Sequence, residues 1–488
     1  MSTRVYSAAM TGVTPRPVSV EVHLGKTNSK FGLVGLPDTA VREARYRVRA
    51  AMASSGYEMP RSEVTVNLAP ADLPKAGSAF DLPIALGVLI ADGKVSIRHP
   101  GVVAVGELAL DGRVRSCRGV LAATLVAVRE GIPCIVPREM AAEAALVPAV
   151  DLYAVGGLAE AVSALEGRMA PSSSRTPEAP TLPVPDMADV RGQEFARRGL
   201  EIAAAGRHHL LMSGPPGMGK TMLAKRLPGI LPRFTGEEEM EVACVWAAAN
   251  RRRPVRVRPF RAPHHTASVA GLLGGGSGIP TPGDLSLAHH GVLFLDELGE
   301  FPAHLIDALR QPLEEGLVTI TRRGVSVTFP CRALVVAATN PCPCGWSNDT
   351  VRQCRCSPAS VERYRRRLSG PLLDRFDVRV FLGRMETGEM TGSPGEPSEA
   401  VRKRVSRARE IQARRGGLNG DLSSAALDAL AWSGKARRVL GGNIDRGNLT
   451  GRGYDRVRRV ARTLADLGES ERVESVHVLE ALSYRTGV

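Results

Sequence analysis

The sequence predicts an α/β protein in three parts. Residues 1–168 form a mixed α+β part, residues 187–384 a parallel sheet with helices on both faces, and residues 398–488 a helical part. Three observations lead to this prediction. The middle part alternates short apolar runs with helical stretches, which is typical of a sheet covered by helices. Segments rich in Pro with Gly, Ser or Thr separate the parts at residues 169–186 and 385–397, as linkers do. The last part has helical periodicity and no convincing strand.

Composition limits the classes of protein that this chain can belong to. Of the 488 residues 43% are hydrophobic, which suits a well-packed globular protein. The longest apolar run, residues 82–91, is far shorter than the about 20 residues of a membrane-spanning helix. Residues 1–13 do not read as a secretory signal. We therefore expect a cytoplasmic protein without a membrane partner.

Charge is concentrated at the C-terminal end. The chain has 64 basic and 50 acidic residues, and residues 400–488 alone contain 18 basic and 10 acidic residues, a net charge of +8. A basic part of this kind suggests a polyanionic partner such as nucleic acid. The alternative is an arginine-rich set of solvated helix faces.

The first part mixes strands with helices. Residues 19–24 and 64–68 alternate apolar and polar side chains, as half-buried strands do. Residues 39–53 and 119–130 space their apolar side chains like helices.

Residues 214–221 fit the phosphate-loop pattern G-x-x-x-x-G-K-[ST]. An apolar strand at residues 210–212 precedes the loop, and a helical pattern at residues 222–227 follows it. Glycines let backbone N–H groups surround phosphate oxygens at the start of a helix. Lys220 would reach the β- and γ-phosphates and Thr221 would supply a hydroxyl to Mg²⁺. The loop consists of Gly214, Pro215, Pro216, Gly217, Met218, Gly219, Lys220 and Thr221.

Polar side chains end two further strands. The apolar run at residues 292–295 ends in Asp296, which would hold Mg²⁺, and Glu297, which would polarise the attacking water. The run at residues 333–338 leads to Asn340, whose amide can position that water. The alternative for Asn340 is a turn-forming residue before a proline.

These three motifs together resemble the AAA+ ATPases. Longer stretches are similar to the magnesium-chelatase-like branch and, within it, to the ComM/YifB family. They lie at residues 189–193, 259–265, 272–276, 291–297, 340–345 and 369–377. The resemblance covers nearly the whole chain. It implies ATP and Mg²⁺ as cofactors, self-association into a ring, a hexamer, and a branch-migration helicase linked to natural transformation. Its partner would be branched or single-stranded DNA.

The resemblance also assigns arginines to the site. Arg375 matches the arginine finger, which stabilises transition-state charge at a neighbouring subunit's γ-phosphate. The alternative is a structural ion pair with Asp374 or Asp377. Arg452, at the start of a helix, matches the second sensor arginine of the helical lid, and Arg456 one turn further is the alternative.

Two basic segments are candidates for phosphate-backbone contacts. Residues 319–330 read as a hairpin whose tip contains Arg322 and Arg323, and residues 363–367 contain four arginines. Phosphate contacts would make DNA binding sequence-independent and salt-sensitive. The alternatives are a solvated hairpin tip and a contact of residues 363–367 with a neighbouring subunit. In the resembling branch, the region between the phosphate loop and Asp296 forms an insertion that faces the pore of the ring.

Four of the eight cysteines form two close pairs, Cys342 with Cys344 and Cys354 with Cys356. Four thiolates can hold Zn²⁺ tetrahedrally, although the C-x-C spacing is less common than C-x₂-C. Reduced, unliganded thiols are the alternative. A metal here would fasten the loop after Asn340. We expect the other four cysteines to be small core residues, and the pair at 264–265 (His-His) to be buried and hydrogen-bonded.

Residues 1–168 resemble the proteolytic domain of Lon-type proteases. The stretches at residues 73–82 and 106–114 carry this resemblance. Aligning them puts Ala79 at the position of the serine nucleophile and Leu121 at that of the lysine base, so Ser–Lys chemistry is absent. A register shifted to Ser78 is the alternative. The resemblance implies a role in assembly or DNA contact.

The sequence therefore favours an ATP-driven DNA motor. A metal-insertion chaperone subunit of the magnesium-chelatase type is the alternative, but it would not need residues 1–168. An ATP-dependent protease is disfavoured by Ala79.

Overall fold

The computed structural model divides into two compact units. One contains residues 1–180, 235–255 and 323–327, and the other contains residues 181–234, 256–322 and 328–488. The structure describes residues 5–26, 30–75, 77–148, 150–172, 184–251, 257–276, 279–322, 325–347, 349, 351–367, 373–385, 388–389 and 392–485. Much of the predicted linker at residues 169–186, and part of that at 385–397, lies outside them. No helix in the described part of the chain is long and apolar enough to cross a membrane.

The first unit is built on a seven-stranded mixed sheet of order β3-β4-β2-β1-β5-β8-β9. The predicted strands lie within β2 and β4, which pair antiparallel with Val20 opposite Leu68. Strands β1, β5, β8 and β9 run parallel to one another. The strands are β1 (Val5–Thr11), β2 (Thr14–Leu24), β3 (Phe31–Val34), β4 (Val64–Ala69), β5 (Val102–Ala104), β8 (Cys134–Pro137) and β9 (Leu152–Val155).

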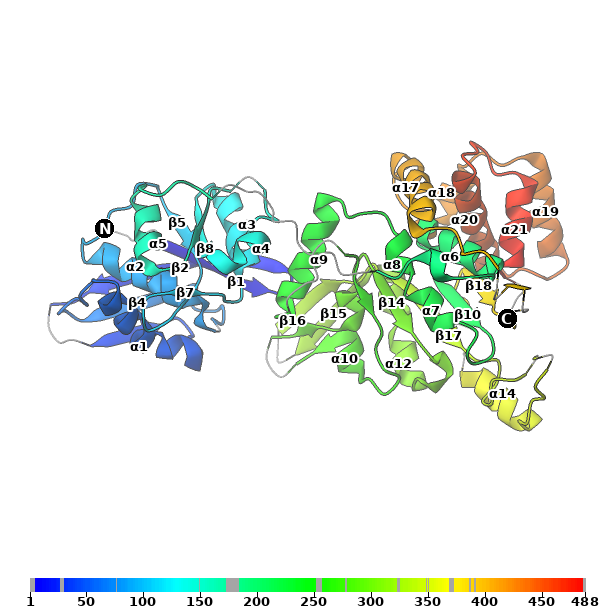
Figure 1. Ribbon diagram of the computed structural model, residues 1–488, viewed down its shortest axis with the longest axis horizontal. Helices are drawn as coiled ribbons and strands as arrows, with labels where there is room; N and C mark the ends of the chain where they lie inside the picture. The colour runs from blue at the N-terminus through cyan, green and yellow to red at the C-terminus, as the bar shows by residue number, and fades with distance from the viewer. Residues whose placement is uncertain are drawn as a thin grey trace. The chain divides into compact units, whose positions relative to one another are not determined.

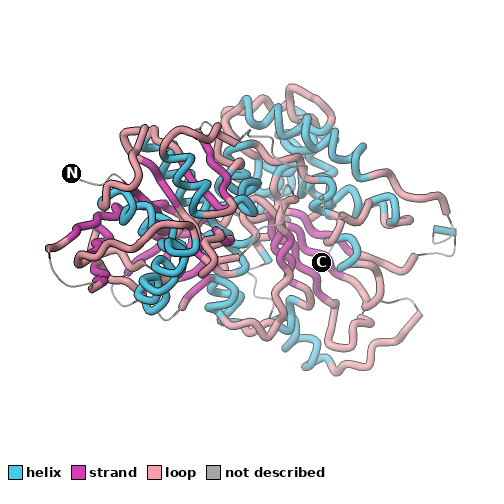
Figure 2. The backbone as a smooth tube through the Cα atoms, turned by 60° about the vertical axis from the view of Figure 1, so that its left-hand side comes forward, coloured by secondary structure: helices cyan, strands magenta, loops and turns pink. Residues whose placement is uncertain are grey.

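Helices pack on this sheet through apolar side chains. Helices α2 and α3 lie against β1 and β2, and Figure 2 shows helices (cyan) beside the strands (magenta). The two helices predicted here are confirmed as α1 and α3. The helices are α1 (Thr39–Ser54), α2 (Asp81–Ala91), α3 (Val120–Glu130), α4 (Ala141–Ala144), α5 (Leu158–Leu165) and α9 (Gly236–Ala248), and a small hairpin joins β6 (Glu107–Leu108) to β7 (Val114–Arg115).

The second unit contains the predicted parallel sheet. Five strands run parallel in the order β11-β14-β17-β10-β18. Ser213 lies opposite Thr339, and Leu295 lies opposite Ala337. The carboxyl ends of the three central strands therefore meet at one edge. The strands are β10 (Leu210–Ser213), β11 (Phe260–Arg261), β14 (Val292–Leu295), β17 (Leu334–Thr339) and β18 (Val378–Phe381).

Both faces of this sheet are covered. Leu210 and Met212 belong to one apolar cluster and Leu211 to another, because successive side chains of a strand point to opposite faces. The helix predicted at residues 222–227 is shorter than expected: α7 ends at Ala224 and a second helix begins at Leu227. Pro228 explains the break, since it has no N–H to donate to the Ala224 carbonyl.

The short elements of this unit surround the sheet. Its helices before residue 398 are α6 (Glu194–Gly206), α7 (Lys220–Ala224), α8 (Leu227–Ile230), α10 (Val269–Leu273), α11 (Asp284–Leu287), α12 (Ala303–Ala308), α13 (Arg310–Glu315) and α14 (Pro358–Arg367). The predicted hairpin is present as β15 (Leu317–Arg322) and β16 (Val325–Pro330), with Thr319 and Thr328 hydrogen-bonded at 2.9 Å.

The C-terminal residues are helical, as predicted. Within residues 398–485 the only strand-like pairing is one isolated bridge between Trp432 and Val473. Helices α17 and α20 pack against α6 in the apolar cluster that also covers the sheet (Figure 1, orange to red). The helices are α17 (Ser398–Arg414), α18 (Ser424–Asp428), α19 (Gly434–Asp445), α20 (Gly451–Leu467) and α21 (Ser475–Ser483).

Candidate active site

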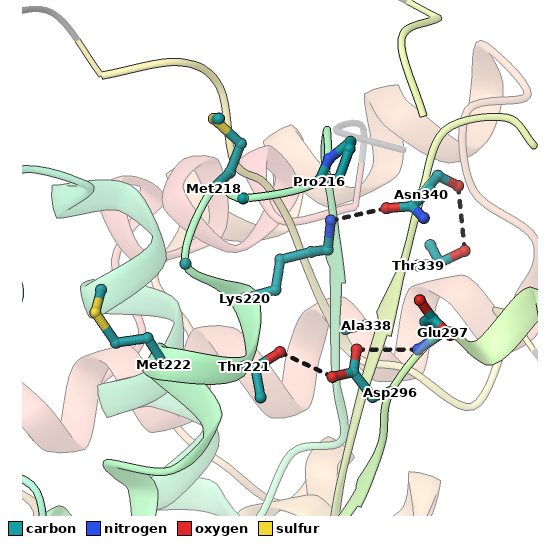
Figure 3. A pocket seen from close by; sticks show the side chains of 12 residues that line it. Pro216, Met218, Lys220, Thr221, Met222, Asp296, Glu297, Ala338, Thr339 and Asn340 are labelled. Atoms are coloured by element: carbon teal, nitrogen blue, oxygen red, sulfur yellow. Dashed lines mark hydrogen bonds between the residues drawn. The ribbon is translucent and has the colours of Figure 1, made fainter. Parts of the chain in front are cut away.

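The predicted phosphate loop lines a cavity at the carboxyl edge of the parallel sheet. The cavity has a volume of about 370 Å³ and is lined by residues 216–222, Asp296, Glu297 and residues 338–340. The three motifs found in the sequence therefore meet in one place (Figure 3). Gly214 and Pro215 belong to the same loop and accept hydrogen bonds from Lys220.

Glycines give the loop its shape. Gly217 and Gly219 have φ angles of 81° and 87°, a left-handed conformation that other residues rarely adopt. A Cβ atom at Gly214 would lie 2.3 Å from the carbonyl oxygen of Leu382. Only glycine fits these positions, so the backbone can fold tightly before α7 begins at Lys220.

Lys220 connects the loop to the strand-end amide. Its ammonium donates hydrogen bonds to the carbonyls of Gly214 and Pro215 and, at 3.0 Å, to Oδ1 of Asn340. Burial lowers the pKa of Lys220, and the carboxylates of Asp296 and Glu297 oppose that shift. Lys220 and Asn340, predicted from separate motifs, are thus direct neighbours (Figure 3).

Thr221 and Asp296 form an oxygen donor set. The Thr221 hydroxyl donates to Oδ2 of Asp296 at 2.8 Å, and Oδ1 of Asp296 accepts the backbone N–H of Glu297 at 3.0 Å. A hydroxyl and a carboxylate beside phosphate groups are the ligands that Mg²⁺ prefers. These two side chains therefore fit the ion that the sequence predicts.

Glu297 is held in an unusual backbone conformation. Its φ is 52°, and its side chain is 57% exposed at the cavity. Non-glycine residues with positive φ are uncommon and cluster at functional sites. Nδ1 of His265 lies 3.8 Å from Oε2 of Glu297.

The prediction of a buried histidine pair is wrong. His264 is exposed and hydrogen-bonds to the Thr266 hydroxyl at 2.8 Å, and the His265 side chain is 33% exposed. The reason is that β11 ends at Arg261, so both histidines lie in the loop beyond the sheet edge. No sequence pattern links His265 to Glu297, since they are 32 positions apart.

A second cavity holds the predicted arginines. It has a volume of about 640 Å³, is lined by Arg375, Arg452 and Arg456, and shares no lining residue with the first cavity. Arg375 forms an ion pair with Glu314, and its side chain is 11% exposed. The two aspartates named above as alternative ion-pair partners of Arg375 contact other arginines instead. Asp374 lies near Arg379 and Arg485, and Asp377 pairs with Arg456.

Asp377 is the centre of a buried polar network that the sequence did not reveal. It contacts Arg456 at 2.7 Å and His208 at 3.0 Å, and His208 in turn contacts the Thr463 hydroxyl at 2.7 Å. Burial acts to raise the pKa of Asp377, but His208 and Arg456 hold that pKa well below its usual range. The network joins α20 to the start of β10 and to the segment that carries Arg375.

Only one of the two candidate sensor arginines belongs to this network. Arg456 is held by Asp377 and is largely buried. Arg452, the second residue of α20, is exposed in the second cavity and has no hydrogen bond or ion pair with the described residues. Of the two, Arg452 is therefore the one available to a ligand.

The basic segments differ in how much of them the structure describes. Arg322 is exposed at the end of β15, whereas Arg323 lies outside the described residues. Arg363 and Arg366 are exposed on α14, and Arg366 pairs with Glu362 at 3.0 Å. Tyr364 between them is buried, so Arg363 and Arg366, three positions apart, lie on the opposite, exposed side of the helix.

The predicted cysteine quartet is assembled in space. All four sulfurs, from Cys342, Cys344, Cys354 and Cys356, lie within 4.8 Å of one another. Of the remaining cysteines, Cys134, Cys244 and Cys331 are buried and Cys117 is half-buried.

The positions that match the protease dyad are apolar and buried. Ala79 and Leu121 are 7% and 1% exposed. The hydroxyl of Ser78, the alternative nucleophile, is hydrogen-bonded to the carboxylate of Glu107. Neither register pairs a serine with a lysine at these positions.

The five-stranded parallel sheet with a phosphate loop, a carboxylate pair and a strand-end amide is characteristic of an AAA+ module, and the family matches place it in the magnesium-chelatase-like class. Comparison with known families agrees. Residues 186–390 match the family "Magnesium chelatase, subunit ChlI", residues 20–140 match "Subunit ChlI of Mg-chelatase", and residues 395–485 match "Magnesium chelatase, subunit ChlI C-terminal".

The chain belongs to the ComM/YifB family. It is 42% identical to Competence protein ComM of Haemophilus influenzae over 99% of this chain and 97% of that protein. It is 41% identical to the protein YifB of Escherichia coli over 99% of this chain and 96% of that protein. A more distant similarity, 28% identity, links 36% of this chain to 54% of the magnesium-chelatase 38 kDa subunit of Rhodobacter capsulatus. The family implies ATP and Mg²⁺ as cofactors.

Proposed function

We propose that this protein is an ATP-hydrolysing ring motor that acts on DNA, as a branch-migration helicase in recombination or natural transformation. One observation carries the proposal. Arg375 and Arg452 line a cavity that is separate from the cavity of Lys220 and Asp296. Arginines that stabilise the transition state must reach the γ-phosphate. They would do so at the nucleotide of a neighbouring subunit. In a closed ring, here a hexamer, the nucleotide cavity of every subunit faces the arginines of the next one.

In this proposal the first cavity binds the nucleotide. The loop amides and Lys220 hold the phosphates, and Thr221 and Asp296 hold Mg²⁺, which neutralises developing phosphate charge when it is bound. Glu297 accepts a proton from the attacking water, and Asn340 orients that water.

In the same ring, Arg375 leaves Glu314 and reaches the neighbour's γ-phosphate. Arg452 approaches the same nucleotide from the start of α20, so that residues 398–488 act as the lid. We also propose a structural Zn²⁺ at the four-cysteine cluster, and an assembly or DNA-contact role for the protease-like residues 1–168.

DNA is the proposed substrate for three reasons. Residues 400–488 carry a net charge of +8. Arg322, Arg363 and Arg366 are exposed. A full-length relative is named a competence protein. Contacts with phosphates would make binding sequence-independent and salt-sensitive, and an action on DNA is consistent with the cytoplasmic location that we propose.

A metal-insertion chaperone of the magnesium-chelatase type is the second candidate. The family descriptions favour it. The share of this chain that each relative matches argues against it: the chelatase subunit matches 36% of the chain, whereas ComM matches 99%.

The test uses the full-length protein with ATP, Mg²⁺ and three DNAs: a four-way junction, a linear duplex and a single strand. We expect the junction to stimulate ATP hydrolysis most, and its arms to be separated in a gel assay. Lys220→Ala serves as the inactive control. A rate that is indifferent to all three DNAs at low salt would exclude a DNA motor and leave an ATPase for another partner.

A further inference from the structure

The four cysteines have the geometry of a single-ion site. Cys342 lies 3.4 Å from Cys344 and 3.7 Å from Cys354, and Cys344 lies 3.7 Å from Cys354, measured between sulfurs. A tetrahedron with Zn–S bonds of about 2.3 Å has edges of about 3.8 Å. All four are free thiols within 4.8 Å of one another. The cluster is therefore sized for one ion and is too tight for the irons and sulfides of an iron–sulfur cluster.

Backbone N–H groups support the sulfurs. The amide of Ser347 donates to the sulfur of Cys342 at 3.3 Å, and the amides of Trp346 and Arg355 are hydrogen-bonded to Cys344. Such donors stabilise thiolates and orient them as metal ligands. Cys342 is fully buried, so this sulfur is shielded from bulk water.

The loop that carries the cysteines touches the phosphate loop. Gly345, between the two cysteine pairs, has a φ of 81°, and a Cβ atom there would lie 2.6 Å from Cδ of Pro216. The chain passes so close to Pro216 that no side chain fits between them. Because Cys344 immediately precedes Gly345, anchoring that cysteine fixes the surface on which the phosphate loop rests.

The same segment supports β17, the strand that ends at Thr339, just before Asn340. After Cys356 the chain forms α14, whose Tyr364 hydroxyl lies 3.3 Å from the Thr339 hydroxyl. A Cβ atom on Gly299, two residues after Glu297, would lie 2.5 Å from that tyrosine hydroxyl. Gly345 and Tyr364 thus place the described parts of this segment against the phosphate loop and against the strand that leads to Asn340.

Trp346 holds the middle of the loop. The guanidinium of Arg352 lies 4.5 Å from its ring centroid, and that of Arg384 lies 5.7 Å away. Arg384 also donates to Asp349 at 2.9 Å. The two arginines thus pack on Trp346, and Arg384 connects the cysteine loop to the segment after β18.

From these contacts we infer that Cys342, Cys344, Cys354 and Cys356 bind one Zn²⁺ that clamps the cysteine loop against Pro216 and Thr339, so that metal occupancy controls nucleotide binding. The inference rests on the proposed nucleotide site, and it makes the metal a positioning element of that site. A displacement of about 1 Å at such a site can cost about 10²-fold in function.

The experiment measures metal and nucleotide separately on the full-length protein. Elemental analysis of protein purified without added zinc should find about one Zn per chain. Zinc is then stripped with a mercurial and chelator, the mercurial is removed from the cysteines with excess thiol, excess Mg²⁺ is restored, and a fluorescent ATP analogue is titrated. We expect analogue binding to weaken about 10- to 100-fold and to recover when Zn²⁺ is added back.

Matched variants distinguish the effect of losing zinc from the effect of losing the contact between Gly345 and Pro216. Cys344→Ser should lose both zinc and analogue affinity, whereas Cys331→Ser, a buried cysteine outside the cluster, should keep both. Gly345→Ala keeps all four ligands but collides with Pro216, so it should retain zinc and lose affinity.

Either half of the inference can fail by itself. Iron, or no metal, in the purified protein would overturn the zinc assignment. Stoichiometric zinc whose removal leaves analogue binding unchanged would overturn the clamp. Neither readout contains DNA, so failure of the DNA-motor proposal would leave both results intact.

Discussion

The two cavities of the second unit differ in the charged side chains that line them, and in the proposed function they are complementary halves of an ATPase site. The lining of the first has Lys220, Asp296 and Glu297 as its charged residues and contains no arginine. The second has six arginines against five carboxylates and lacks a phosphate loop. Neither cavity provides both the cradle for a triphosphate and the arginines that stabilise its cleavage. The difference indicates that catalysis depends on how subunits meet, and each prediction tests that division.

Arg375→Ala should have the largest effect. Without the finger we expect the ATPase rate to fall by about 10³- to 10⁵-fold, while binding of a fluorescent ATP analogue stays unchanged, because Arg375 does not line the nucleotide cavity. A loss of binding equal to the loss of rate would instead place Arg375 at its own subunit's nucleotide.

Mixing two inactive variants sharpens the comparison. Lys220→Ala destroys the first cavity and leaves Arg375 intact, whereas Arg375→Ala does the reverse. A ring assembled from both contains interfaces with an intact lysine facing an intact arginine. The mixture should therefore hydrolyse ATP faster than either variant alone, and a mixture as inactive as its components would argue against sites shared between subunits.

Glu297→Gln tests the base within the first cavity. The amide keeps the size of the side chain but cannot accept the proton of the attacking water. We expect turnover to fall by about 10²- to 10⁴-fold with ATP binding retained, measured by phosphate release and analogue titration. Glu300→Gln, three residues along the chain, is the control and should hydrolyse ATP at the normal rate.

Arg452 and Arg456 should separate catalysis from stability. Arg452→Ala removes an exposed arginine and should lower the ATPase rate by about 10²-fold without changing the melting temperature. Arg456→Ala leaves the buried Asp377 without one partner and should lower the melting temperature. If Arg452→Ala instead destabilised the fold and kept the rate, the two assignments would have to be exchanged.

The parts of the site that could be predicted are those with a local pattern. Lys220, Thr221 and Asp296 lie within short motifs that follow apolar strands, and a parallel sheet brings the ends of such strands together. Asn340 was predicted in the same way. The roles of these residues stay predictions, but their meeting in one cavity follows from the strand order.

The parts that could not be predicted depend on residues far apart in the chain. His208 and Asp377 are separated by 169 positions, and no periodicity links them. The contact of Gly345 with Pro216 is equally non-local. The histidines at 264–265 are predicted to be buried, whereas His264 is exposed and His265 is half-buried. Both follow the end of β11, which no sequence pattern marks, and a difference of a few residues moves a side chain from the sheet to its edge.

The smallest expected effect is in the link between α20 and the sheet. Asp377→Asn keeps the shape of the side chain and removes the charge that pairs with Arg456. We expect the free energy of opening of α20, measured by hydrogen exchange, to fall by about 1.5–3 kcal/mol at neutral pH.

The same comparison has a defined pH dependence. The folded pKa of Asp377 is depressed, so the contribution of its charge to stability is complete above the carboxyl's unfolded pKa of about 3.9 and is lost as pH falls through the folded value. The difference between the two proteins should therefore be constant from neutral pH down to about pH 5 and shrink below about pH 4. A difference that grew with acidification would mean that Asp377 is protonated in the folded protein, and the link between α20 and the Arg375 segment would then have to rest on His208 and Thr463 instead.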